Sequence, residues 1–168
     1  MVELVTERLR LRRARPDDLH ALHAVLSHPA AMRYWSTPPH TELAQTEAWL
    51  ADMIEATDED FVVEHRGSVI GKAGAYRLPS VGYILHPESW GSGLASEALS
   101  AVIAHVFATR AVDRLTADVD PRNAASIRLL QKLGFVETHR APRTWLVGEE
   151  WCDSVYLALD RPAAIPPP

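Results

Sequence analysis

Hydrophobic and polar positions follow two different periods along the chain, and these periods predict its elements. Residues 9–14 begin with alternating leucine and arginine, the period of two expected of a half-buried strand. The proline and two aspartates at 16–18 predict the start of a helix, because proline in a first turn loses no helical hydrogen bond and carboxylates favour the positive end of the helix dipole. A second helix is predicted over residues 41–57.

Later segments repeat these two patterns. Two short apolar runs flank Arg66-Gly67, which predicts a hairpin. Further strands are predicted at 81–85, at 115–119, from 135–136 onward and at 155–159, and further helices at 94–107 and at 127–133, where Gly134 ends the second one. The resulting order is strand, two helices, three strands, helix, strand, helix, two strands. It predicts an α/β or α+β fold in which helices pack on a mixed sheet.

Composition and charge narrow the class of protein. The 168 residues, 47% hydrophobic and 23% charged, fit one globular domain, which we expect over residues 1–160, followed by a flexible proline-rich tail at 161–168. With 17 basic against 22 acidic residues, the chain lacks the cationic excess that broad nucleic-acid binding requires. No run approaches the roughly 20 apolar residues of a membrane span, and the amino end lacks the features of a secretory signal. We therefore expect neither nucleic acid nor membrane as a partner.

The numbers and spacing of cysteine and histidine residues indicate the redox state of the compartment and whether a metal site is expected. Cys152 is the sole cysteine, which excludes an intrachain disulfide and a multi-cysteine zinc cage and fits a reducing, cytoplasmic setting. We interpret it as a packing residue. His20 and His23 stand three residues apart on a predicted helix, but no carboxylate at a fixed spacing completes a site, so we expect no metal.

The sharpest local signal is Trp90-Gly91-Ser92-Gly93-Leu94-Ala95, between a predicted strand and the longest predicted helix. Its small residues let a ligand approach the main chain, and the unpaired amides of a first helical turn can bind the oxygens of a pyrophosphate. The simpler interpretation is a tight turn that needs glycine for its own backbone. The segment matches neither the dinucleotide fingerprint nor the Walker loop.

A second signal is Asp120-Pro121-Arg122-Asn123-Ala124-Ala125-Ser126, which follows a predicted strand and begins a helix. Asn123 is a good N-cap residue and Ser126 falls in the first turn, so helix capping alone explains both. The segment continues as Ile127-Arg128-Leu129-Leu130-Gln131-Lys132-Leu133-Gly134-Phe135.

Taken together, residues 83–99 and 123–135 resemble the GNAT acyl-CoA N-acyltransferase superfamily, in its RimJ/RimL-like branch. The likeness extends to residues 6–12, 32–35 and 151–156 and so covers nearly the whole chain. It implies a mixed, mostly antiparallel sheet of about seven strands, with four helices packed on both faces and splayed central strands near Leu85 and 115–119.

The resemblance also implies roles for the two motifs. Acetyl-CoA is the implied co-substrate, its pyrophosphate lies on the loop and its pantetheine arm lies between the splayed strands. Asn123 holds that arm, and the hydroxyl of Ser126 protonates the departing thiolate. The cofactor contacts expected on this basis are Leu85, His86, Trp90, Gly91, Ser92, Gly93, Leu94, Ala95, Asn123 and Ser126. Because Trp90 stands where the wider superfamily usually has Gln or Arg, phosphate binding should rest more on amides.

Transfer to an amine needs an uncharged nucleophile and stabilisation of the oxyanion on the thioester. A lysine amine has an ordinary pKa of about 10.4 and an α-amine about 8, so the α-amine needs less help. A main-chain amide near Leu85 or His86 is the best candidate for the oxyanion, because a fixed dipole needs no reorganisation.

The general base is less defined, because Arg143-Thr144-Trp145 stands where some relatives have an acid. The candidates are Glu55, His86, Glu149, Glu150 and Asp153, and bulk water is an alternative. Asp153 matches the family's pattern best and is our predicted catalytic residue beside Ser126 and Leu85. Tyr34, Trp35 and Trp49 fall in the helical region that, by resemblance, roofs the acceptor site, and they are either substrate contacts or core residues.

The leading hypothesis is an N-acetyltransferase acting on a protein N-terminus or a small amine. The alternatives are transfer from a larger acyl-CoA, a CoA-binding regulatory or interaction module with little or no turnover, and a nucleotide binder that uses the glycine loop. The arginines of residues 8–13 form either a solvated strand face or a steering patch for an anionic cofactor. Exposed edges and aromatic end segments are compatible with a homodimer.

Overall fold

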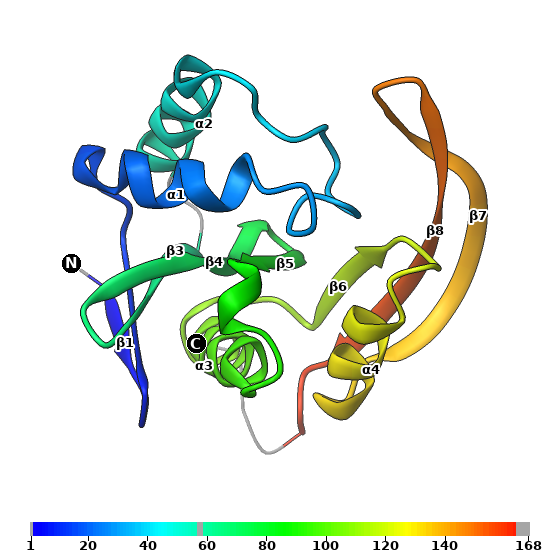
Figure 1. Ribbon diagram of the computed structural model, residues 1–168. Coiled ribbons are helices and arrows are strands. Elements are labelled where there is room, and N and C mark those ends of the chain that lie inside the picture. Colours follow the sequence, from blue (N-terminus) through cyan, green and yellow to red (C-terminus); the bar gives the residue numbers. More distant parts are fainter. Residues whose placement is uncertain (1, 57–58, 164–168) are drawn as a thin grey trace.

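The computed structural model describes residues 2–56 and 59–163 as a sheet with helices on both faces (Figure 1). The strands are β1 (Glu3–Val5), β2 (Leu9–Arg12), β3 (Glu59–His65), β4 (Ser68–Arg77), β5 (Ser80–Leu85), β6 (Arg114–Val119), β7 (Val136–Val147) and β8 (Glu150–Asp160). The helices are α1 (Leu19–Leu26), α2 (Leu43–Glu55), α3 (Leu94–Thr109) and α4 (Ala124–Lys132). The strand order is β1-β2-β3-β4-β5-β6-β8-β7.

The predicted order of elements is confirmed, with one strand more than expected. The additional strand is β1, whose three residues are too few to show a period and are mostly exposed. The first helix begins as a 3-10 turn at Pro16–Asp18, as the proline and aspartates indicated. The predicted helix end at Thr57 and most of the predicted tail, 164–168, lie outside the described residues. Arg161, the first residue of that tail, is anchored, because its side chain donates to the carbonyls of Val112 and Arg110.

Alternation along β3 shows how the two helical layers share the sheet. Phe61 and Val63 are fully buried in the large core that includes α3, whereas Val62, between them, packs against α1 and α2. Burying each such side chain stabilises the fold by about 1.5–3 kcal/mol. A strand covered on both faces in this way reads as a continuous apolar run.

The arginine stripe is not the uniformly solvated face that one interpretation of the sequence expected. Arg12 is 6% exposed, and its guanidinium binds Asp18 at 2.7 Å and Glu64 at 2.7 Å. Asp18 also accepts a hydrogen bond from the amide of Arg15. This buried group ties β2 to the start of α1.

The functional consequence of the topology lies between β5 and β6. They are paired in parallel and share a single bridge, between Ser80 and Thr116, whereas β6 and β8 pair along six consecutive positions. Beyond the bridge the two strands diverge, so the sheet opens at its centre, as the splayed pair predicted. Across the described residues, no helix is both long and apolar enough to cross a bilayer.

Candidate active site

The loop before α3 presents a row of main-chain amides. Gly91 and Gly93 have φ of 73° and 80°, a left-handed conformation that glycine adopts without steric cost. Within the described chain, the amides of residues 91–96 have no internal hydrogen-bond partner, whereas that of Trp90 donates to the carbonyl of Pro87 and that of Glu97 to Gly93. From Gly91 onward the loop therefore has main-chain amides free to donate to a ligand, and its role in binding an anion stays a prediction.

The side chain of Arg8 anchors this loop through hydrogen bonds, a role that the sequence analysis did not assign. Its Nη1 donates to the carbonyl oxygen of Ser92 at 2.8 Å, and its Nε and Nη2 bind Glu97 at 2.7 Å. In a trans peptide the C=O and the next N–H point in opposite directions. Anchoring the Ser92 carbonyl on Arg8 therefore turns the Gly93 amide away from Arg8. Gly93 lines the cavity described next.

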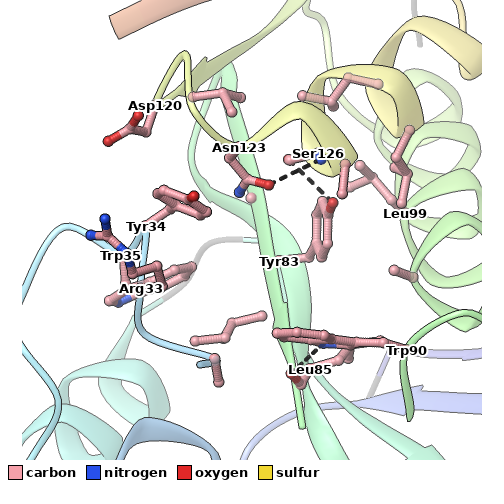
Figure 2. A pocket seen from close by; sticks show the side chains of 18 of the residues that line it. Arg33, Tyr34, Trp35, Tyr83, Leu85, Trp90, Leu99, Asp120, Asn123 and Ser126 are labelled. Carbon is pink, nitrogen blue, oxygen red and sulfur yellow. Dashed lines mark hydrogen bonds between the residues drawn. The ribbon is translucent and has the colours of Figure 1, made fainter. Parts of the chain in front are cut away.

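A cavity of about 810 Å³ runs from this loop into the opening between β5 and β6. Figure 2 shows Trp90 and Leu85 at one end and Asn123 and Ser126 on the opposite wall. The indole Nε1 of Trp90 donates to the Leu85 carbonyl at 3.0 Å. Leu94, also expected at the cofactor, is 3% exposed and belongs to the core beneath the loop, so that only its amide can contribute.

Of the two main-chain amides expected to stabilise the oxyanion, one already has a hydrogen-bond partner. The amide of His86 donates to the Ile70 carbonyl at 2.8 Å, and His86 does not line the cavity. In an antiparallel pair successive residues direct their polar backbone groups to opposite sides. Leu85 therefore directs its amide away from β4, toward the opening. The amide of His86 is therefore corrected from an oxyanion candidate to a donor in the β4–β5 pairing, while the contacts of His86 and Leu85 with the cofactor stay predictions.

Three residues meet on the α4 side of the cavity (Figure 2). The side-chain oxygen of Asn123 accepts from the amide of Ser126 at 3.2 Å, so Asn123 is the helix cap that the simpler interpretation required. The hydroxyl of Tyr83, on β5, donates to Oγ of Ser126 at 3.1 Å. Burial raises the pKa of Tyr83 and its bond to Ser126 only partly offsets this, so Tyr83 keeps its proton. Because the oxygen of Ser126 accepts this hydrogen bond, the hydroxyl proton of Ser126 remains available for donation to a ligand.

A second cavity, of about 500 Å³, lies beside the first and shares part of its wall. Tyr34, Trp35 and Trp49 all line it, and the first two also line the first cavity. The three aromatics predicted at the acceptor thus lie together.

The residues predicted as general base differ in whether they line a cavity. Glu150 and Asp153 line the second cavity, whereas Glu55, His86 and Glu149 line neither cavity. Asp153 is exposed, and its Oδ1 accepts from the amide of Arg143, a residue held at φ 51°. Its role as a base stays a prediction.

The side chain of Arg122 connects the segment before α4 with β8. It binds Asp120 through two nitrogens, Nε at 2.9 Å and Nη2 at 2.6 Å, and Glu150 of β8 through Nη1 at 2.6 Å. Burial raises the pKa of Asp120, but the hydrogen bonds and charge of Arg122 outweigh it and hold that pKa below its ordinary value. Cys152 lies 3.5 Å from the same guanidinium and, half-buried, lines the second cavity.

Comparison with known proteins agrees with this architecture. The family model described as "Acetyltransferase (GNAT) domain" matches residues 8–136. The chain belongs to the GNAT acetyltransferase family. Its relatives include an uncharacterized N-acetyltransferase p20 of Bacillus licheniformis, 31% identical over 80% of this chain and 83% of that protein. The [ribosomal protein uS5]-alanine N-acetyltransferase of Escherichia coli is 34% identical over 53% of this chain and 46% of its own length.

Solved structures show the same fold. The spermidine N-acetyltransferase of Vibrio cholerae, in complex with CoA and spermine, superposes with a TM-score of 0.78 at 22% identity and covers 93% of this chain and 97% of its own. The resemblance read from the two motifs is confirmed, and this GNAT protein is an N-acetyltransferase.

Proposed function

We propose that this GNAT protein transfers the acetyl group of acetyl-CoA to a primary amine by direct attack of the amine on the thioester. The observation that carries the proposal is the opening between β5 and β6. Its cavity is lined at one end by Gly91, Gly93 and Ala95, whose amides are unpaired, and on one wall by Ser126. The solved relative from Vibrio cholerae holds CoA and spermine, which supports a CoA donor and an amine acceptor.

The residues of the first cavity suit an acyl-CoA. The loop amides receive the pyrophosphate without a cationic side chain, because they lie at the positive end of the 16-residue helix α3. The apolar wall suits the pantetheine arm, and the amide of Leu85 is directed toward the opening where an oxyanion forms. Asn123 caps α4 and thereby fixes the first turn that carries Ser126.

The chemistry requires that a C–N bond forms as the C–S bond breaks. The hydroxyl of Ser126 is placed to donate a proton to the departing sulfur, because its oxygen already accepts from Tyr83. The amine loses one proton, which a base or water accepts. The net products are an acetamide and free CoA thiol.

The second cavity suits an amine. Its lining carries more carboxylates (Asp52, Asp60, Asp118, Asp120, Glu150 and Asp153) than cationic groups (Arg33 and Lys72). Such a wall attracts a cation and raises its local concentration. We propose acceptors of two kinds, following the relatives: a protein N-terminus beginning with alanine, or a polyamine.

The test combines purified protein, acetyl-CoA and a panel containing an alanine-initiated peptide and spermine. We expect thiol release that depends on the acceptor, together with the acetylated amine by mass spectrometry. CoA binding without acceptor-dependent release would instead support the regulatory module. Absence of CoA binding would overturn both.

A further inference from the structure

The two cavities meet at the first open position beyond the β5–β6 bridge. Counting two residues along each strand from the Ser80–Thr116 bridge gives Gly82 on β5 and Asp118 on β6. Both residues line both cavities. Gly82 presents no side chain at this point, and a Cβ added there would be in ordinary contact with the ring of Tyr76, at 3.4 Å from Cε1. The opposite side carries a carboxylate.

Most other carboxylates of the two cavities are already neutralised by a cation. Asp120 and Glu150 are bound by Arg122, and Asp60 is bound by Nζ of Lys72 at 2.7 Å. In each pair the cation offsets the negative charge that a reacting amine would need. Asp60 keeps a buried Oδ1 without a hydrogen-bond partner, but it lines only the second cavity. These ion pairs fit structural roles.

Asp118 differs in its contacts. Its Oδ2 accepts a hydrogen bond from Nε1 of Trp145, on β7, at 2.8 Å. Within the described chain it has no ion-pair partner, and its Oδ1 has no hydrogen-bond partner. The indole therefore fixes the orientation of the carboxylate while one oxygen remains able to accept a proton.

The two remaining acids each line a single cavity. Asp52 and Asp153 line the second cavity but not the first. The Oδ1 of Asp153 also accepts from the amide of Arg143 at 2.9 Å, which supports a left-handed backbone position. Two criteria, access to both cavities and the absence of a neutralising cation, are met together by Asp118.

We propose that Asp118 is the general base of the transfer reaction, an inference that rests on the proposed function. As the amine nitrogen shares its lone pair with the thioester carbon, its N–H becomes more acidic and the proton passes to Oδ1 of Asp118. The C–N bond forms, the C–S bond breaks and the sulfur receives the hydroxyl proton of Ser126, which Ser126 regains from solvent. Asp118 then returns its proton to solvent, to which it is exposed.

The decisive variant is Asp118→Asn, which keeps the shape and the Trp145 contact but cannot accept the proton. It is assayed with two acceptors of the same shape: an aliphatic amine from the panel and its alkoxyamine analogue, in which oxygen replaces the methylene next to the nitrogen. We expect kcat/KM to fall about 10²–10⁴-fold for the aliphatic amine. The loss should be much smaller for the alkoxyamine, because water can remove its more acidic proton.

Asp153→Asn is the rival variant, because Asp153 is the base expected from the sequence. If it acts only on the Arg143 backbone, it changes both rates by one common factor. A loss that depends on acceptor basicity in Asp153→Asn, or an equal loss or none in Asp118→Asn, would overturn the assignment. Failure of the unmodified protein to acetylate any amine would overturn the proposed function and the assignment together, so the two failures are distinguishable.

Discussion

The two cavities of the site are built in different ways. The first presents main-chain amides and apolar side chains, supplied mainly by the loop before α3, by β5 and by the start of α4. The second is bounded by charged and aromatic side chains from α2, β3, β4, β6, β7, β8 and the loop after α1. Backbone amides can be presented by many different sequences, whereas the charge and shape of the second cavity depend on the particular side chains of this chain.

The strongest test of the first cavity, which presents main-chain amides, is Gly93→Val. A non-glycine residue in the left-handed region costs roughly 1–2 kcal/mol. The strained loop also loses amide–phosphate bonds, each worth about 1.5–3 kcal/mol. Losing two such bonds lowers the affinity for CoA about 100-fold or more, as titration calorimetry would show.

Gly67→Val is the matched control, because Gly67 has the same φ of +80° in the β3–β4 turn and open space around its Cβ. It should reduce stability by a similar amount and leave CoA affinity unchanged. An equal loss of affinity in both variants would show that general strain, and not the amide loop, sets the affinity.

A test inside the first cavity uses Ser126→Ala. We expect kcat to fall about 100-fold with little change in the KM for acetyl-CoA. Alanine favours helix, and the cap from Asn123 to the backbone of residue 126 is retained, so the fold is preserved. Steady-state kinetics at saturating acceptor measures the effect.

Tyr83→Phe sharpens the same test. Removing its hydrogen bond, worth about 0.5–1.5 kcal/mol, should slow the enzyme up to about tenfold. In the Ser126→Ala background it should have no further effect, because Tyr83 acts through that hydroxyl. A full additional loss in the double variant would mean that Tyr83 acts independently.

The smallest expected effect is a pH-dependent change in the stability of the protein, caused by Asp120 in the wall of the second cavity. The folded-state pKa of Asp120 lies below its unfolded value, so its ionised form stabilises the protein above the unfolded pKa, near 4. This contribution is lost as the pH falls through the folded-state pKa. The difference in Tm between the natural chain and Asp120→Asn should therefore be largest at neutral pH and shrink below about pH 4. A difference that stays constant down to pH 3 would contradict the role of the Arg122 pair.

Prediction from sequence succeeded where a signal is local. The glycine loop, the Asn123 cap and the alternation of the strands each depend on residues close along the chain. The role of Arg8 was missed because its partners, Ser92 and Glu97, stand 84 and 89 positions away. The error at His86 has a similar origin, since only the pairing with β4 reveals that its amide is occupied.

By itself, the amino-acid sequence determined the order of elements, the buried faces and the two motifs, because helix and strand periods, glycine and capping residues act within a few positions. Tertiary structure decided which carboxylates are neutralised, which amides stay unpaired and that Asp118 lines both cavities. Those outcomes depend on distances between segments remote in the chain, and Coulomb energies and hydrogen bonds vary steeply with such distances.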